Sequence, residues 1–293
     1  MTSVLAEAGP TLDLLSDLHR LTAYPFMVNA LEAGTIVAVM AGIVGWFMVL
    51  RRESFAGHTL SLMSFPGAAG ALLVGASAAT GYFVFAGAAA LAIGATARTE
   101  HRGARGESSA LTGTVQAFGL ACGFLFLSLY QGVLANYENL LFGSFLGITR
   151  GQVLTLALVA ATTLCAIAAA GRPLLFASLD ERVARAHGVP TRALRMGFLL
   201  LLGLAVAETA QITGALLVFA LLVAPAATAQ LITARVGAGL ALSVALGVAT
   251  VWLGLALAYF YDYPVGFYIT TVGFALYVLV RAGRALRERR AVA

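Results

Sequence analysis

The feature that most constrains this chain is a succession of long apolar runs, separated by short segments that carry most of its charge. An α-helix needs about 20 apolar residues to cross a hydrocarbon core of about 30 Å. The pattern therefore predicts an all-α fold, a polytopic bundle of about eight or nine transmembrane helices. The candidate spans are residues 26–50, 59–79, 82–97, 110–132, 152–171, 196–208, 212–232, 237–258 and 265–281.

Composition argues against the other broad classes of protein. The chain is 60% hydrophobic and 11% charged, whereas a soluble domain is typically about 45–50% apolar and about 25% charged. A water-soluble enzyme and a disordered chain are both disfavoured. The net charge of +5 would suit a nucleic-acid-binding domain, but the basic residues lie in short clusters between apolar runs. We therefore expect a lipid bilayer as the partner and no nucleic acid.

The arginines orient the bundle. All 18 basic residues are arginine, and with the N-terminus outside, 16 of them fall in the inner segments. Cytoplasmic loops carry such an excess, so this distribution predicts an outer N-terminus and a cytoplasmic C-terminus. We expect a multi-pass protein of a prokaryotic plasma membrane. Its single transmembrane domain covers residues 26–281, and residues 282–293 form a basic cytoplasmic tail. Residues 1–25 form either an outer tail or a short amphipathic helix.

No enzymatic motif is present. The chain has no HExxH, no GxSxG and no GxxxxGK[ST] motif, so we expect neither an enzyme nor ATP hydrolysis by this chain itself. Polar side chains within the apolar runs are costly in hydrocarbon and mark functional sites by default. They include Glu32 in the first run, then His58, Ser61 and Ser64, and then Glu208 and Gln211. Glu208 stands at a predicted span boundary, and so it either serves transport or caps a helix end.

The segment 172–195 predicts a short helix at the cytoplasmic face. Ser178 suits the N-cap position, and Glu181 three residues later completes a capping box. Gly188, with a proline two residues later, ends the helix after about nine residues. Leu179, Val183 and Ala186 share one apolar face at helical spacing. This face suits either a groove on a soluble partner or the bilayer surface, and the residues alone leave both open.

Several stretches together resemble the membrane permeases of metal-uptake ABC transporters, the family that imports zinc, manganese or iron(II). They occur in order over about residues 25–285 and are specific as a set. They are Phe26–Leu31 through Gly34, Gly42–Arg52, Phe55–Ser61, Leu141–Gly147, Leu179–Gly188 and Gly214–Ala229.

The resemblance implies a homodimeric permease on two copies of a cytoplasmic ABC ATPase, which binds the ATP. An extracytoplasmic metal-binding protein would deliver the ion, which would pass along the dimer axis. No cofactor bound by this chain is implied. The short helix would be the coupling helix that docks into the ATPase. Its coupling residues would be Leu179, Asp180, Glu181, Val183, Ala186, His187 and Gly188.

The resemblance also indicates metal-contacting residues. Many members carry Gly-Asp-x-x-Ser-His after the Arg-Arg pair, and its outer two positions are proposed to touch the metal. Here His58 stands at the Asp position of this motif and Ser61 at its Ser position. Leu62 stands where the motif has its histidine. We take His58 as the candidate metal ligand and Glu208 as a second one. The pathway residues are Ser61, Leu62, Ser64 and Gln211.

Imidazole suits zinc, whereas a carboxylate would suit manganese better, so the sequence favours zinc by a small margin. Three alternatives stay open beside the zinc importer. One is a manganese or iron importer of the same family, and another is a permease for a metal chelate. The third is an ion-coupled secondary transporter that uses Glu32 or Glu208 and needs no ATPase. A non-transporting membrane scaffold would tolerate the loss of His58.

Overall fold

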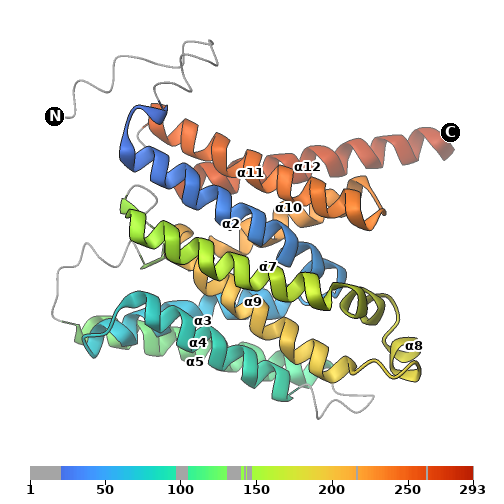
Figure 1. The fold of residues 1–293 in the computed structure, drawn as a ribbon, viewed down its shortest axis with the longest axis horizontal. Coiled ribbons are helices and arrows are strands. Elements are labelled where there is room, and N and C mark those ends of the chain that lie inside the picture. Colours follow the sequence, from blue (N-terminus) through green and yellow to red (C-terminus); the bar gives the residue numbers. More distant parts are fainter. Residues whose placement is uncertain are drawn as a thin grey trace.

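The structure, a computed structural model, describes residues 21–96, 105–130, 140–141, 143, 147–215, 217–261 and 263–292. Long helices lie side by side with their axes close to one direction (Figure 1). They are α2 (Pro25–Leu50), α3 (Ser54–Leu73), α4 (Ala78–Thr96), α5 (Arg105–Leu129), α7 (Arg150–Leu179), α9 (Thr191–Thr213), α10 (Val218–Ile232), α11 (Val236–Phe260) and α12 (Val265–Val292), with the short α8 (Glu181–Ala186) between α7 and α9.

The all-α bundle predicted from the apolar runs is confirmed. Among the described residues, each predicted span corresponds to one long helix, in the same order. Six of these helices, α2, α4, α7, α9, α11 and α12, are long and apolar enough to cross a membrane. Helices α3, α5 and α10 are not in that set, so the number of spans stays a prediction. The predicted basic tail, 282–293, continues α12 as helix to Val292.

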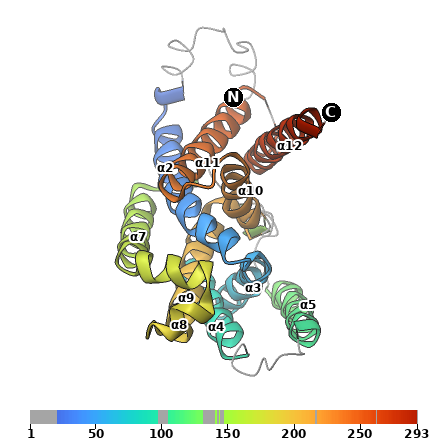
Figure 2. The same cartoon turned by 90° about the vertical axis from the view of Figure 1, so that its right-hand side faces the viewer.

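Helix α9 lies in the interior of the bundle. It contacts α2, α3, α4 and α7, and the view along the helices shows these elements around it (Figure 2). On one side α3 packs against α4 and α5, and on the other α2 packs against α10 and α11. A Cβ atom on Gly45 would lie 2.0 Å from the carbonyl oxygen of Leu222. Small residues thus let α2 and α10 approach backbone to backbone.

Two predicted boundaries were wrong. The run 152–171 continues as α7 to Leu179, and the run 196–208 is the middle of α9, which spans Thr191–Thr213. The polar stretch from Glu208 resembles a helix end in the sequence. It is instead buried inside the protein, where backbone hydrogen bonds keep it helical. The chain breaks later, at Gly214, whose φ is +74°.

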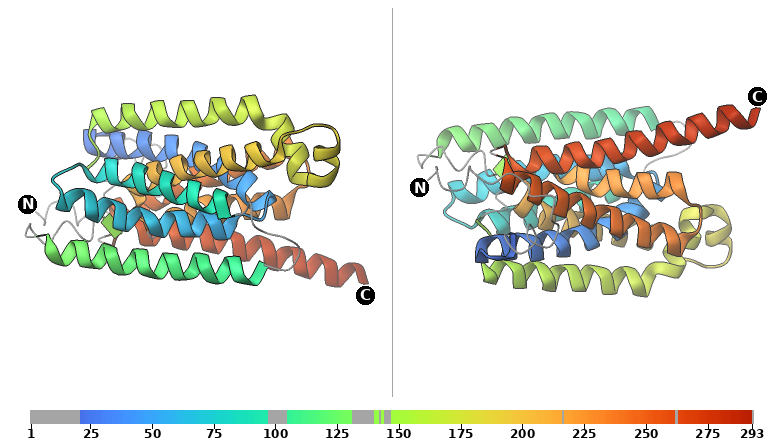
Figure 3. Two further views of the ribbon diagram at one scale, coloured as in Figure 1. Left: turned by 90° about the horizontal axis from the view of Figure 1, so that it is seen from below. Right: turned by 90° about the horizontal axis from the view of Figure 1, so that it is seen from above.

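The arginine-bearing turns share one end of the bundle. Arg51 at the end of α2 donates to the Ser178 hydroxyl in α7 at 3.2 Å. Arg284 of α12 donates to the Leu231 carbonyl at the end of α10 at 3.3 Å. Helix α8 and the C-terminal end of α12 project from this same end (Figure 3). The predicted grouping of these arginines on one side therefore holds, whereas Arg20, Arg98 and Arg102 lie outside the described residues.

The opposite end holds a different ion pair. Arg150 begins the 30-residue α7 and therefore lies far from the turn that contains Ser178. Its guanidinium donates to the carboxylate of Glu32 on α2, and both side chains are exposed, 73% and 41%. Glu32 is thus a paired residue at the protein surface. The geometry gives no support to Glu32 as an unpaired, ion-coupling carboxylate.

Candidate functional site

His58 lies in the second turn of α3 and is half-buried. Its ring meets that of Phe219, in the first turn of α10, edge to face with centroids 5.0 Å apart. The Nδ1 atom is buried and has no hydrogen-bond partner. A buried polar atom without a partner is costly, and a free imidazole nitrogen is a metal ligand. His58 therefore has an uncommitted nitrogen at the position where the sequence motif predicts a metal contact.

The two serines near His58 donate their hydroxyl hydrogens to backbone carbonyl oxygens. The Ser61 hydroxyl donates to the carbonyl oxygen of Ala215. The Ser64 hydroxyl donates to the Leu60 carbonyl of its own helix at 3.1 Å. Both serines are buried, and Leu62 between them is 9% exposed. A pathway role for Ser61, Leu62 and Ser64 thus stays a prediction, while Ser61 has a structural role that the sequence did not indicate.

Ser61 belongs to a set of contacts around the break between α9 and α10. Behind that break, the Ala215 amide donates to the carbonyl of Leu140 at 3.1 Å. The hydroxyl of Tyr82, on α4, donates to the same carbonyl at 3.2 Å. Unpaired backbone groups inside a membrane protein cost several kcal/mol each, on the order estimated for amides in hydrocarbon. These side chains therefore make an irregular backbone tolerable in the interior.

Glu208 and Gln211 lie three residues apart on α9 and share one side of it. Glu208 is 0% exposed, and neither of its carboxylate oxygens has a hydrogen-bond partner. The Nε2 atom of Gln211 is likewise buried and unpartnered. Glu208 precedes the end of α9 by five residues, so the alternative that it caps a helix end was wrong. Its role as a metal ligand stays a prediction.

No complete metal site forms within one chain. Over the part of the chain that the structure describes, no group of three or more His, Cys, Asp and Glu side chains is placed to hold a metal ion. An ion in transit needs only weak, successive contacts, because it must leave each one. A transit contact at His58 stays a prediction.

The short helix α8 exists where the sequence placed it, but its cap was predicted wrongly. The backbone of α7 remains helical through Leu179, and the Ser178 hydroxyl donates back to the Leu174 carbonyl of its own helix. Asp180 is extended instead, with φ −147°. Its carboxylate accepts from the amides of Arg182 and Val183 at 2.9 and 3.0 Å. Asp180 is therefore the N-cap, and α8 has six residues.

The predicted apolar stripe is exposed, but it does not lie on one helix, because Leu179 ends α7, Asp180 is extended, and only Val183 and Ala186 belong to α8. Leu179 is 68% exposed and Val183 is 43% exposed, and Ala186 is exposed as well. At the end of α8, the ring of His187 packs edge-on against that of Phe176 on α7, with centroids 5.8 Å apart. Gly188, with φ +80°, then turns the chain toward α9. The stripe is thus held on a fixed turn and is free to contact another surface.

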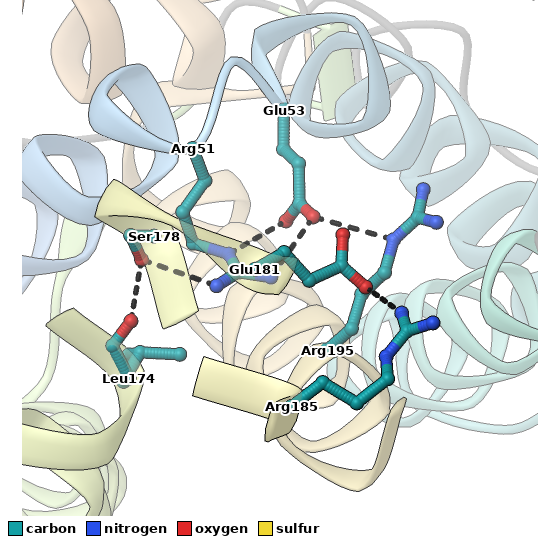
Figure 4. Close-up of polar contacts among 7 residues, drawn as sticks. All are labelled: Arg51, Glu53, Leu174, Ser178, Glu181, Arg185 and Arg195. Carbon is teal, nitrogen blue, oxygen red and sulfur yellow. Dashed lines mark hydrogen bonds and ion pairs between the residues drawn. The ribbon is translucent and has the colours of Figure 1, made fainter. Parts of the chain in front are cut away.

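A cluster of charged and polar side chains lies beside α8 (Figure 4). The Arg51 guanidinium donates to both carboxylate oxygens of Glu53, at 3.3 and 3.4 Å, and lies over the ring of Phe198 at 5.1 Å. Arg195 near the start of α9 contacts the same carboxylate at 3.4 Å. Arg51, Glu53, Ser178 and Arg195, which we call the Glu53 cluster, help to line a cleft of about 480 Å³.

Comparison with known proteins settles the family. Residues 23–283 match the ABC 3 transport family. The chain belongs to this family. The resemblance indicated by the sequence motifs is therefore confirmed, and the match covers the whole helical bundle from α2 almost to the end of α12.

Three relatives of this ABC 3 family chain show how far the similarity extends. The manganese transport system membrane protein MntC of Halalkalibacterium halodurans is 29% identical over 260 residues, 89% of this chain and 88% of that protein. The chelated iron transport system membrane protein YfeC of Yersinia pestis is 30% identical over 249 residues, 85% and 83% of the two chains. PsaBC from Streptococcus pneumoniae, solved in complex with Fab, superposes with a TM-score of 0.81 at 27% identity and covers 91% of this chain and 94% of that one.

Membership of the ABC 3 transport family places the chain among the multi-pass membrane permeases of ABC transporters. The prediction that this chain is not itself an enzyme is consistent with relatives named as transport system membrane proteins. An ion-coupled carrier that works without an ATPase is correspondingly disfavoured, and the surface ion pair of Glu32 agrees with that.

Proposed function

We propose that this chain is the membrane permease of an ATP-driven importer of a divalent first-row metal. The free Nδ1 of His58, buried at the position of the family's metal-contacting motif, is the observation that carries the proposal. Two copies of the chain form the permease, and an extracytoplasmic metal-binding protein delivers the ion. The described residues of one chain offer no group of three or more metal ligands, and in the proposed homodimer a second His58 would add a ligand to the path.

Manganese or iron(II) is the substrate that we propose first. The two relatives named above are a manganese transport protein and a chelated iron transport protein. Zinc remains the second candidate, since imidazole nitrogen is a ligand that zinc accepts readily. The substitution of Leu62 for the usual histidine removes one nitrogen ligand per chain. That loss weakens the argument for zinc, which prefers a closed set of nitrogen and sulfur ligands.

The arginine-rich end of the bundle is proposed to face the cytoplasm of a prokaryotic cell. The turn after α2, the loop around α8 and the end of α12 all carry arginines at this end. This is the distribution that the positive-inside rule describes. Helix α8 then stands in the cytoplasm. Its exposed Val183 and Ala186, together with Leu179 at the end of α7, dock into a groove of the ABC ATPase.

The test of the proposed function is metal uptake by proteoliposomes that contain this chain, its ATPase and its binding protein. Radioactive manganese, iron(II) and zinc are offered in parallel, with and without ATP. ATP-dependent uptake that prefers manganese or iron supports the proposal in full. A preference for zinc would replace the first substrate by the second. No uptake of any free ion, with active ATP hydrolysis, would contradict a permease for free metal ions and favour a chelate.

Replacing His58 by alanine is expected to lower uptake about tenfold or more, the loss seen even for groups that only support a metal ligand. Assembly of the dimer with the ATPase should not change, because the ring contact that the substitution removes, with Phe219, lies within one chain. Phe55→Ala is the matched control, since that side chain lies one turn earlier on α3 and is 50% exposed. Normal uptake by His58→Ala would remove His58 from the pathway.

A further inference from the structure

Glu53 stands at the start of α3, but its carboxylate is not used to cap that helix. It is the N-cap residue of α3, and its side chain makes no hydrogen bond to the helix. Both carboxylate oxygens point instead to Arg51, and Oε1 also contacts Arg195. The arrangement therefore uses the charge of Glu53 to hold two arginines from other segments, and capping is not its role.

The ion pair is almost completely enclosed. The side chains of Arg51 and Glu53 are 9% and 10% exposed, whereas Arg195 is 40% exposed. The other ion pairs of the described residues, such as Arg284 with Glu288, have exposed side chains on both partners. Removing one partner of an enclosed pair leaves a charge without compensation, so such a pair holds its geometry far more firmly than a surface pair.

The Glu53 cluster fastens the turn before α3 to both helices that flank α8. Arg51 reaches Ser178 in the last turn of α7, and that turn leads directly into α8 (Figure 4). Arg195 lies in the first two turns of α9, which follows α8. Helix α8 has no ion pair to α3 of its own, since Glu181 pairs with Arg185 within α8. Beside the direct packing of α3 against α9, these contacts connect both neighbours of α8 to the start of α3 through Glu53.

We propose that Glu53 is a positioning residue that transmits movement of α8 to α3 and so to His58. His58 follows Glu53 by five residues, a rise of about 7.5 Å along the helix. This inference rests on the proposed function, since it assumes that α8 docks on the ATPase and that His58 contacts the metal. It assigns to one carboxylate a part of the mechanical connection between these two sites, beside the direct packing of α3 against α9.

The test is Glu53→Gln, which keeps the size of the side chain and removes its charge. Metal uptake and ATP hydrolysis are measured in the same proteoliposomes, together with recovery of the ATPase on co-purification. We expect normal recovery and continued hydrolysis, with metal moved per ATP reduced about tenfold, within the range of coupling between two sites. Glu288→Gln, the same change in an exposed pair of α12, should leave the ratio unchanged.

Arg195→Gln is the second variant, because it leaves the Arg51–Glu53 pair intact and so avoids an uncompensated carboxylate. We expect a smaller reduction of the same ratio. An unchanged ratio in both variants overturns the proposal. So does a Glu53→Gln variant that loses the ATPase while Arg195→Gln couples normally, since that result assigns the cluster a purely structural role.

A measurement that needs no metal separates this inference from the proposed function. A cysteine at the exposed Phe55, in a chain with Cys122 and Cys165 replaced by alanine, is labelled with a maleimide with and without ATP and vanadate. We expect ATP to change the labelling rate in the otherwise unchanged chain and not with Glu53→Gln added. An ATP response that persists with Glu53→Gln overturns the inference. If the unmodified transporter takes up no metal but ATP still changes the labelling rate, only the proposed function is overturned.

Discussion

An aspartate at position 183 is expected to abolish metal uptake while the permease itself remains folded. Val183 is 43% exposed, so the new carboxylate stays in water as long as α8 is free. Docking into an ATPase groove would have to bury that charge among apolar groups without a partner, at a cost of several kcal/mol. Since about 1.4 kcal/mol corresponds to a factor of ten, we expect uptake to fall about 100-fold or more. Leu179→Asp should act in the same way.

Co-purification of the ATPase, uptake and thermal unfolding of the permease are the measurements for these variants. Val183→Leu is the matched control, since it keeps the stripe apolar, and it should assemble and transport normally. If Val183→Asp recovers its ATPase and transports metal at the normal rate, the stripe does not dock on the ATPase. It would then be assigned to the surface of the bilayer, the alternative that the residues alone left open.

Gly214→Ala is expected to destabilise the fold severely. Gly214 has φ +74° and ψ +158°, a region of backbone conformation that is essentially restricted to glycine. An added Cβ would also lie 2.3 Å from the carbonyl oxygen of Leu141 and 2.4 Å from the amide nitrogen of Gly143. These are backbone atoms and cannot rotate away. Strain and overpacking together cost roughly 2–6 kcal/mol.

Thermal unfolding in detergent tests this second prediction, with Gly171→Ala as its control. Gly171 lies within α7, and no atom would lie within 4 Å of its added Cβ. Alanine there should raise the stability by about 0.5–1 kcal/mol, the usual gain of alanine over glycine inside a helix. Equal unfolding temperatures for the two variants would show that the break after α9 tolerates a side chain.

The sequence predicted the helices well because hydrophobic length is a local property. Most apolar runs became one helix each, whereas the run 212–232 contains the break at Gly214 between α9 and α10. The face of Leu179, Val183 and Ala186 that helical spacing predicts is divided between the end of α7 and α8. The errors arose where a polar side chain lies inside the protein and not in water. The stretch that begins at Glu208 was placed at a helix end, although Glu208 is fully buried. Hydropathy cannot distinguish a polar side chain inside the protein from one in water.

The sequence predicted single residues of the candidate site, but not the contacts between them and distant segments. The motif after Arg52 led to His58, and the structure added its contact with Phe219, which lies 161 positions away in the sequence. The bonds from Ser61 to Ala215 and from Ala215 to Leu140 join distant segments that share no sequence pattern. The same holds for Glu53, which the sequence shows only as an acidic residue after two arginines. Such contacts depend on how the helices pack.

The shortness of α10 has a consequence for biosynthesis. Its 15 residues rise about 22 Å, less than the roughly 30 Å of hydrocarbon that an independent span must cross. Its preceding turn also needs the carbonyl of Leu140 and the hydroxyl of Ser61 to satisfy the backbone of Ala215. We therefore expect the translocon to release α10 into lipid only together with neighbouring helices that are already inserted. The order in which segments leave the ribosome then matters for this protein, because α10 depends on partners synthesised long before it.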